Sequence, residues 1–410
     1  MGISLGLVGL GAFGRCFAPL FKSHPLVSRI GLCDREVERV RKYADDPAYR
    51  DKFNARDAYA SLEEILKADF DALVIITQPW LHAGQCIRAM ESGKHVYSAV
   101  PIVSLPDADE ILDWCDKLVN TSRRTGMKYM LGETTTYRPE TQFCRRKARE
   151  GAFGKFVLAE GQYLHDVDSP SCNLREVQAH RLNSAAGREW IELKKAYDQR
   201  GIKGGPMHYP THSTGGPINV MRTHALKASC IGQPGPTGDA YFAGEFGNET
   251  GFFVLANGAT MRISEYRMIG HPGEETFRIF GTEGTYREKR WVDKKGSVEL
   301  NREEMREGLP TDVMDAFWKG VHGEERKPAD FYKDKDFDSA KASEKALGGH
   351  GGSHAYLAHE FVSAVAENRQ PLINAWEAAR YMAPGAVAHK SALRDGEWLA
   401  VPDWGDAPNP

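Results

Sequence analysis

The fold follows from one stretch near the start of the chain, Leu7-Val8-Gly9-Leu10-Gly11-Ala12-Phe13-Gly14. The apolar run from Ile3 to Val8 predicts a strand, and the pattern from Ala12 to Phe21 predicts a helix. Glycines between a strand and a helix allow a tight turn and let the backbone approach a pyrophosphate at the helix N-terminus. This spacing in this context predicts a dinucleotide-binding Rossmann unit.

An acidic residue, Asp34, follows the next predicted strand, Ile30 to Cys33. A carboxylate about 20 residues after the glycines accepts hydrogen bonds from ribose hydroxyls and repels a 2′-phosphate, so NAD is favoured over NADP. Arg35 leaves NADP as an alternative cofactor, because an arginine at this position can bind the 2′-phosphate or lie on the adenine. The alternative is a glycine turn that binds no cofactor. It is disfavoured because the strand, the helix and the acidic residue all occur at the spacing that the dinucleotide motif requires.

The first third of the chain alternates short apolar runs with helical patterns. Further strands are predicted at Ala72 to Ile76 and His95 to Tyr97, and helices at Trp80 to Ser92 and Asp107 to Asn120. This alternation predicts an α/β fold that begins with a Rossmann domain, a doubly wound parallel sheet over residues 1–138.

After about Pro139, longer strands predict a C-terminal α/β domain over residues 139–410, with a large, open, mostly antiparallel sheet. The strands are Phe156 to Tyr163, Glu249 to Leu255, Thr260 to Tyr266 and Thr276 to Phe280. The charge-rich segment from Arg287 to Gly349 is predicted to run over the surface. Two amphipathic helices, Ala355 to Glu367 and Trp376 to Lys390, complete the pattern and can pack back on the Rossmann domain.

The composition narrows the class of protein. A net charge of −3 over 410 residues gives no basic surface for nucleic acid. No apolar run reaches the roughly 20 residues that span a bilayer, and no basic leader precedes the first strand. Seven cysteines without a Cys-x-x-Cys pair fit reduced thiols. We therefore expect a cytoplasmic protein with no nucleic-acid or membrane partner and no metal.

Three further motifs resemble the Gfo/Idh/MocA superfamily of sugar and inositol dehydrogenases. They are Thr77-Gln78-Pro79-Trp80-Leu81-His82, Glu91-Ser92-Gly93-Lys94-His95-Val96 and Phe277-Arg278-Ile279-Phe280-Gly281-Thr282-Glu283-Gly284-Thr285. The resemblance implies a homo-oligomer, a dimer or tetramer formed through the open sheet. With the Rossmann fingerprint, it implies that NAD is held by Gly9, Gly11, Ala12, Phe13, Gly14, Asp34, Arg35, Thr77, Gln78, Pro79, Trp80, His82, Ala99, Val100, Pro101 and Thr134.

One departure from the superfamily pattern is informative. Its dehydrogenases carry Glu-Lys-Pro after the Gly-Lys-His-Val strand, and the lysine assists proton transfer, whereas this chain has Ala99-Val100-Pro101. A valine cannot move a proton. The chain is similar here to the NAD-dependent glycoside hydrolases of the family 109 type, which have Glu-Val-Pro, and to related enzymes such as sulfoquinovosidases; Ala99 replaces the glutamate. Other marks of that branch are Leu131-Gly132-Glu133, Tyr163-Leu164-His165-Asp166 and Tyr209-Pro210-Thr211-His212.

The resemblance implies a carbohydrate substrate and a redox detour. A hydride leaves C3 of the glycoside, the ketone acidifies the C2 proton, the C1 leaving group is expelled, water adds and the hydride returns, so NAD⁺ is regenerated. His212 can take and return a proton near neutrality. The candidate catalytic residues are His212, Tyr209, Glu133 and Tyr163.

Candidate substrate-binding residues are His165, Asp166, Arg181, Lys194, Lys195 and His208. The cations between Arg175 and Lys203 could clamp an anionic sugar such as a sulfoquinovoside, or form a solvated helix face. His165 and Asp166 are expected to form an internal hydrogen-bonded pair. A metal site from Asp166, His208 and His212 is disfavoured, because Pro210 interrupts the helix that an i, i+4 histidine pair needs.

Two other functions remain open at this stage. The first is an NAD-dependent sugar or cyclitol dehydrogenase in which His212 replaces the missing lysine. The second is a non-catalytic NAD-binding sensor, which the combination of Glu133, Tyr209 and His212 disfavours.

Overall fold

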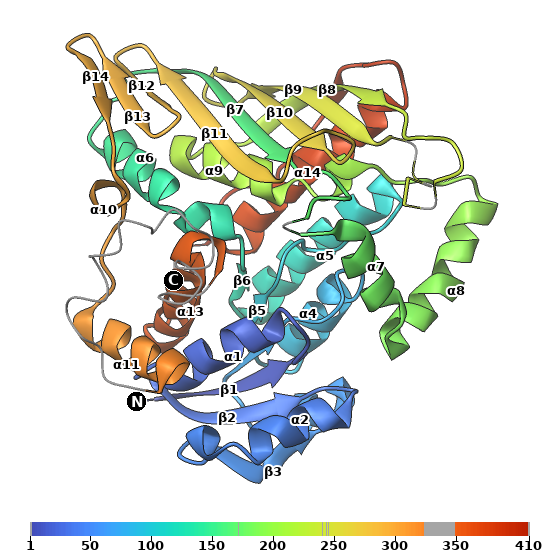
Figure 1. Cartoon of the computed structure of the whole chain (residues 1–410), viewed down its shortest axis with the longest axis vertical. Helices are drawn as coiled ribbons and strands as arrows, with labels where there is room; N and C mark the ends of the chain where they lie inside the picture. The colour runs from blue at the N-terminus through green and yellow to red at the C-terminus, as the bar shows by residue number, and fades with distance from the viewer. Residues whose placement is uncertain are drawn as a thin grey trace.

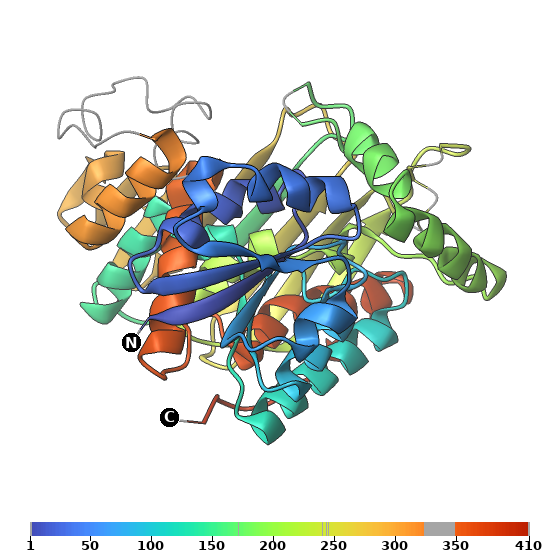
Figure 2. The same ribbon diagram turned by 90° about the horizontal axis from the view of Figure 1, so that it is seen from below.

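The computed structural model describes residues 2–170, 172–239, 241–242, 244, 246–323 and 349–408, and these form two β-sheets with helices around and between them (Figures 1 and 2). The first sheet is parallel, in the order β3-β2-β1-β4-β5-β6, which is the Rossmann order. Its strands are β1 Ile3–Val8, β2 Val27–Cys33, β3 Phe53–Tyr59, β4 Ala72–Ile75, β5 His95–Ser98 and β6 Tyr129–Leu131. The predicted doubly wound parallel sheet is confirmed.

The second sheet has nine strands in the order β14-β13-β12-β11-β7-β10-β9-β8-β15. Among the described strands, β7 and β10 pair in parallel and the other neighbours pair antiparallel, as predicted. The strands are β7 Phe156–Leu164, β8 Ala225–Gln233, β9 Asn248–Leu255, β10 Thr260–Tyr266, β11 Glu274–Gly281, β12 Gly284–Arg287, β13 Arg290–Asp293, β14 Gly296–Glu299 and β15 Leu399–Ala400.

Helices cover both faces of the first sheet and one face of the second (Figure 1). They are α1 Gly14–Ser23, α2 Val37–Ala44, α3 Leu62–Lys67, α4 His82–Glu91, α5 Ala108–Thr125, α6 Pro139–Arg149, α7 Leu174–Leu182, α8 Ala185–Gln199, α9 Thr211–Met221, α10 Arg302–Met305, α11 Thr311–His322, α13 Gly349–Ala366 and α14 Ala375–Ala392. No helix in the described ranges is long and apolar enough to cross a membrane.

The last helices join the two halves of the molecule. Helix α13 packs on α1, and α14 lies between α5 and the strands β8 and β9. Nearly every residue of α14 is buried, so the amphipathic pattern predicted for this helix is wrong. The physical reason is that α14 has a sheet on one side and a Rossmann helix on the other, and small residues such as Ala379, Ala383 and Ala386 let both approach.

The prediction of a surface excursion between Arg287 and Gly349 is wrong for its helical part. Helix α11 buries Phe317 and Trp318, and it packs on α1 of the Rossmann domain. Val313 and Met314 share this buried face at helical spacing, which the high charge of the segment obscured. Residues 324–348 lie outside the described residues.

Candidate active site

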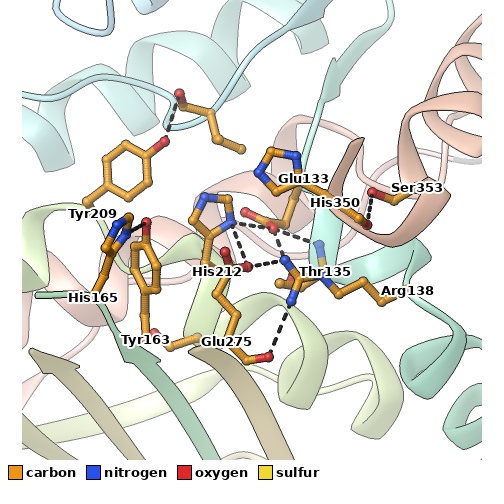
Figure 3. A network of polar contacts seen from close by, with 12 residues as sticks. Glu133, Thr135, Arg138, Tyr163, His165, Tyr209, His212, Glu275, His350 and Ser353 are labelled. Carbon is orange, nitrogen blue, oxygen red and sulfur yellow. Dashed lines mark hydrogen bonds and ion pairs between the residues drawn. The ribbon is translucent and has the colours of Figure 1, made fainter. Parts of the chain in front are cut away.

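The candidate catalytic residues meet where four elements end or begin (Figure 3). Glu133 follows β6 of the Rossmann sheet, and His212 is the second residue of α9. Tyr163 comes from β7 and Glu275 from β11 of the second sheet. Helix α9 can reach this point because Gly161 of β7 has no side chain: a Cβ there would lie 2.0 Å from the Ser213 carbonyl oxygen. The site is therefore built at the junction of the two sheets.

A buried hydrogen bond joins His212 to Glu133 across the two sheets. The Nδ1 of His212 donates to Oε1 of Glu133 over 2.9 Å, and the same oxygen accepts from the Thr135 amide and hydroxyl, each at 2.9 Å. Burial opposes the charge on His212, but Glu133 and Glu275 raise the pKa of the imidazole to about 9. Burial also favours neutral Glu133, but the nearby His212 lowers the pKa of this carboxyl. An imidazole anchored through Nδ1 to a carboxylate presents Nε2 as its reactive atom.

A second ion pair, which the sequence analysis missed, lies beside this one. The guanidinium of Arg138 contacts Oε2 of Glu275 at 2.6 Å, and the same oxygen lies 3.8 Å from Nδ1 of His212. Alternation along β11 places Glu275 on the same face as Phe277, which packs on α9 at Gly216. That alternation was the signal in the sequence, because an acid on the core face of a strand requires a partner.

Tyr163 forms a pair with His165, which lies two residues further along the chain. The hydroxyl of Tyr163 lies 2.8 Å from Nδ1 of His165, and Nε2 of His165 lies 3.0 Å from the Cys172 carbonyl oxygen. A carbonyl oxygen can only accept, so Nε2 carries the proton and Nδ1 accepts from the tyrosine. Burial lowers the pKa of His165, so this imidazole is neutral and able to take a proton. Arg267 lies over the Tyr163 ring at 4.3 Å.

The expected pair between His165 and Asp166 does not form, because Tyr163 is the partner of His165. Asp166 instead holds its own loop: its carboxylate accepts from the amides of Asp168 and Ile269. Asp166 is thus a turn residue and contacts no other side chain of the site.

Tyr209 completes the group of aromatic side chains around His212. Its ring centre lies 5.4 Å from that of His212, and the Tyr163 ring lies at 5.3 Å. The hydroxyl of Tyr209 donates to the carbonyl oxygen of Val100 over 3.4 Å. Burial raises the pKa of Tyr209. The Tyr209 phenol therefore lies beside the position at which the sequence has valine in place of lysine.

The glycine fingerprint forms a cradle that fits a dinucleotide. Gly9 has a φ of +92°, and a Cβ there would lie 2.2 Å from the Ile76 carbonyl oxygen; at Gly14 a Cβ would lie 2.0 Å from the Gly9 oxygen. At Gly11, by contrast, the nearest atom to a Cβ is Nη1 of Arg39 at 3.8 Å, which leaves room for a phosphate. No acidic residue occupies the first turn of α1. Asp34 accepts from the amides of Leu10 and Glu36, so its carboxylate is held at the end of β2.

Helices α7 and α8 form a hairpin (Figure 1), and side chains of α8 contact two loops at the carboxyl edge of the Rossmann sheet. Arg35, after β2, pairs with Glu189 through two hydrogen bonds of 2.6 and 2.9 Å. Trp80, after β4, stacks on Trp190 with ring centres 5.1 Å apart and planes 15° apart. In a Rossmann domain these two loops lie on either side of the adenosine of the bound cofactor. Helix α8 contacts both loops and so spans the adenosine position.

Other predicted residues do not reach the site. Lys194 pairs with Asp198 and Lys195 with Glu192 on the exposed surface of α8. His208 lies under α14, where Nδ1 faces the Leu105 carbonyl oxygen and the ring contacts His389. Burial contradicts the substrate-binding role predicted for His208, whereas the roles predicted for the two lysines stay predictions.

His82 is also structural rather than cofactor-binding. It is 1% exposed, and its Nδ1 lies 2.9 Å from the Pro101 carbonyl oxygen. His82 thus links the turn after β4 to the turn after β5. Asp166, His208 and His212 have the separate partners described above, and within the described residues no group of three potential metal ligands converges.

Comparisons with known proteins agree with this fold. Residues 3–129 match the family model GFO_IDH_MocA, the oxidoreductase family with an NAD-binding Rossmann fold. The glycosyl hydrolase family 109 protein of Solibacter usitatus is 24% identical over 98% of this chain and 88% of its own length. The oxidoreductase domain protein of Kribbella flavida has a TM-score of 0.69 at 16% identity, over 98% of this chain and all of the other. The WlbA dehydrogenase of Bordetella pertussis, solved with NADH and UDP-GlcNAcA, has a TM-score of 0.65 at 16% identity over 98% of both chains.

These findings confirm the resemblance to the Gfo/Idh/MocA superfamily and to its family 109 glycoside hydrolases. They also confirm the cofactor prediction: residues 3–129 form an NAD-binding Rossmann domain.

The His212–Glu133 pair makes a testable prediction about proton affinity. In a Glu133→Gln variant the hydrogen bond can persist but the charge is lost, so we expect the pKa of His212 to fall from about 9 to near or below 6.5. Nitrogen-detected NMR of the imidazole measures this value. Glu275→Gln, which removes the carboxylate at 3.8 Å, should cause a smaller fall. A His212 pKa that does not change in Glu133→Gln would contradict the assignment.

The same pair gives stability a defined pH dependence. Because the folded pKa of His212 lies above its ordinary value of 6.5, the stabilisation from Glu133 is fully present below pH 6.5 and is lost as the pH rises through about 9. The difference in unfolding free energy between the wild type and Glu133→Gln should shrink over that window.

The contact of α8 with Trp80 predicts how firmly the cofactor is held. A Trp190→Ala variant loses the aromatic stack, so we expect NAD to dissociate about tenfold faster. The rate can be followed by chasing bound NADH fluorescence with excess NAD⁺. Ile191→Ala, at an exposed neighbouring position, is the control and should leave the rate unchanged. Equal rates in wild type and Trp190→Ala would show that α8 does not retain the cofactor.

Proposed function

We propose that this chain is an NAD⁺-dependent glycoside hydrolase that cleaves its substrate by transient oxidation at C3. The observation that carries the proposal is the pairing of two proton-transfer dyads, His212–Glu133 and Tyr163–His165, around one point. A dehydrogenase needs one base, at the alcohol, whereas elimination also needs a base at the neighbouring carbon. The similarity to family 109 proteins supports the same reading.

When bound, NAD⁺ would supply reversible acceptance of the C3 hydride. Gly9, Gly11 and Gly14 would hold the pyrophosphate, Asp34 the ribose, and Trp80 with α8 would close over the adenosine. The protein side chains then have to move protons and hold the sugar.

His212 is the base for the C3 hydroxyl. Because its pKa is raised to about 9, His212 is mainly an imidazolium at neutral pH, and oxidation starts from the fraction of enzyme in which Nε2 carries no proton. In that fraction Nε2 accepts the hydroxyl proton while Nδ1 remains hydrogen-bonded to Glu133, whose charge stabilises the imidazolium that forms. The imidazolium can then donate to the C3 ketone oxygen, and this polarisation acidifies the proton on C2. At the end of the cycle the same proton returns to the C3 oxygen. Tyr209, kept protonated by burial and donating to the Val100 carbonyl oxygen, can accept a hydrogen bond from a sugar hydroxyl with its own oxygen.

Tyr163 and His165 form the base for C2. Tyr163 takes the C2 proton as it passes its own phenolic proton to Nδ1 of His165, so no buried tyrosinate has to exist beforehand. The electron pair of the C2–H bond forms the C1=C2 double bond as the C1–oxygen bond breaks. Water then adds its oxygen to C1, and the pair returns a proton to C2. The proton given up by the water balances that taken by the departing aglycone oxygen.

We include anionic sugars in the proposed substrate class, because one arginine near the site has no carboxylate partner among the described residues. Arg138 and Arg267 are paired with Glu275 and Glu265. Arg181 forms no ion pair among the described residues, and its charge acts on Tyr209, where it partly offsets the effect of burial on the pKa. Arg181 is thus the residue that could receive a carboxylate or sulfonate, as in a sulfoquinovoside.

We also propose that the chain works as a homo-oligomer. The face of the second sheet away from α9 and α14 exposes Val157, Ile231 and Phe252, each at least half exposed. Apolar side chains gathered on an open sheet are typical of an interface between copies of a chain.

A two-channel assay tests the proposed activity. Aryl α- and β-glycosides, neutral and anionic, are incubated with enzyme and catalytic NAD⁺, and aglycone and NADH are followed together. We expect aglycone release without accumulation of NADH, because the hydride returns at each turnover. NADH that accumulates with free sugars, and no aglycone release, would instead make the chain a sugar dehydrogenase with His212 as its base.

Variants assign the residues in the same assay. His212→Ala should reduce turnover by at least about 100-fold and leave NAD bound, since His212 contacts none of the cradle glycines. Turnover close to the wild-type rate in His212→Ala would contradict the role of His212 as the base. A wild-type protein that binds NAD but turns over no substrate would favour a sensor.

A further inference from the structure

Two arginines lie at the point where a Rossmann domain distinguishes NAD from NADP. Arg35 directly follows β2, and Arg39 lies on α2, both close in sequence to the ribose-binding Asp34. In NADP-binding domains an arginine at this place receives the 2′-phosphate. The structure shows that Arg35 already has a partner, Glu189 of α8, which lies 154 residues further along the chain.

Asp34 by itself presents only a weakened negative charge to a 2′-phosphate. Its carboxylate accepts from the amides of Leu10 and Glu36, over 2.7 and 2.8 Å. Nη1 of Arg39 lies 3.4 Å from each of its two oxygens. Amide donors and a guanidinium beside a carboxylate offset its negative potential. A second determinant is therefore needed if NADP is to be excluded.

The pair of Arg35 and Glu189 engages both terminal nitrogens of the guanidinium. Nη2 donates to Oε1 over 2.6 Å, and Nη1 donates to Oε2 over 2.9 Å. A guanidinium binds a phosphate through the same pair of donors. The hydrogen bonds from Arg35 lower the pKa of Glu189, so the carboxylate is ionised at neutral pH. While this pair persists, a 2′-phosphate finds no free guanidinium at Arg35.

Glu189 does not depend on the ion pair alone for its place. The two paired side chains are 52% and 59% exposed, and exposed ion pairs are weak by themselves. The next residue, Trp190, stacks on Trp80 with ring centres 5.1 Å apart. Further along α8, the hydroxyl of Tyr197 donates to Glu110 of α5 over 2.6 Å. These contacts hold α8 beside the Rossmann loops, so the carboxylate is already positioned for its partner.

We propose that Glu189 is a cofactor-specificity residue: it reaches from α8 to hold Arg35 in an ion pair and so excludes NADP from the Rossmann domain. The two acids Asp34 and Glu189 then balance the two arginines, and the site has no net positive charge to offer a 2′-phosphate. The inference concerns only the adenosine end of the cofactor, so it holds whichever reaction the protein performs.

The test compares the affinities for NADH and NADPH, which differ only in the 2′-phosphate. The dissociation constants are measured from the fluorescence of the bound reduced nicotinamide, without any sugar. Glu189→Gln keeps the shape of the side chain and removes its charge, so Arg35 becomes available. We expect the Kd for NADPH to fall by about tenfold and the Kd for NADH to change by less than about threefold. The gain should shrink at high salt, because the site is exposed.

Two further variants identify the cause of any change. Glu192→Gln removes the same charge from the same helix, three residues further on, where Glu192 pairs with Lys195. This matched control should keep the wild-type ratio of the two dissociation constants. The double variant Glu189→Gln/Arg35→Gln removes the guanidinium as well, so the gain in NADPH affinity should be lost.

The ratio of the two dissociation constants decides the outcome. A ratio that is unchanged in Glu189→Gln would overturn the proposal, and equal weakening of both dinucleotides would assign Glu189 to cofactor retention alone. The same gain in Glu192→Gln, or a gain that persists without Arg35, would also overturn it, because a general change of charge would then explain the effect. Since no sugar is present, the result is independent of the glycosidase proposal.

Discussion

The structure of the site depends on one buried interaction, the hydrogen bond between His212 on α9 and Glu133 at the end of β6. Neither charge would be stable alone in this environment, because an unpaired buried ion loses its hydration without compensation. Together they lower the pKa of the carboxyl and raise that of the imidazole. Since Glu133 follows the last Rossmann strand and His212 lies on the helix that packs on β7, the same interaction also ties the Rossmann domain to the second sheet.

The rest of the site is arranged around this pair by close packing. Gly161 lets α9 lie directly on β7, which brings Tyr163 within 5.3 Å of the His212 ring centre. The pair of Arg138 and Glu275 closes the far side, and α14 fills the space between the sheets. The α7–α8 hairpin then covers the loops that would hold the adenosine. A cofactor retained in this way would suit a reaction in which the hydride leaves and returns within one turnover.

Local patterns predicted the fold well where a motif and its flanking elements agreed, as at Gly9 to Gly14. Strand β3 was missed because it is an edge strand with polar side chains such as Asn54 and Arg56, and α11 because charge obscured its apolar face. In the site, short motifs identified His212, Glu133, Tyr163 and Tyr209. Glu275, which the packing of β11 against α9 brings there, was not found. Lys194 and Lys195 have partners on their own helix, and their role in substrate binding stays a prediction.

The central claim is that the glycosidic bond breaks by elimination after C2 is deprotonated. Hydrolysis in D₂O tests it most directly, with the released sugar analysed by NMR and mass spectrometry. Because the proton removed from C2 is held by the exchangeable Tyr163–His165 pair before it returns, the account predicts deuterium at C2 of the product. A product that keeps its original hydrogen at C2, at a normal rate of aglycone release, would contradict it and indicate direct displacement at C1.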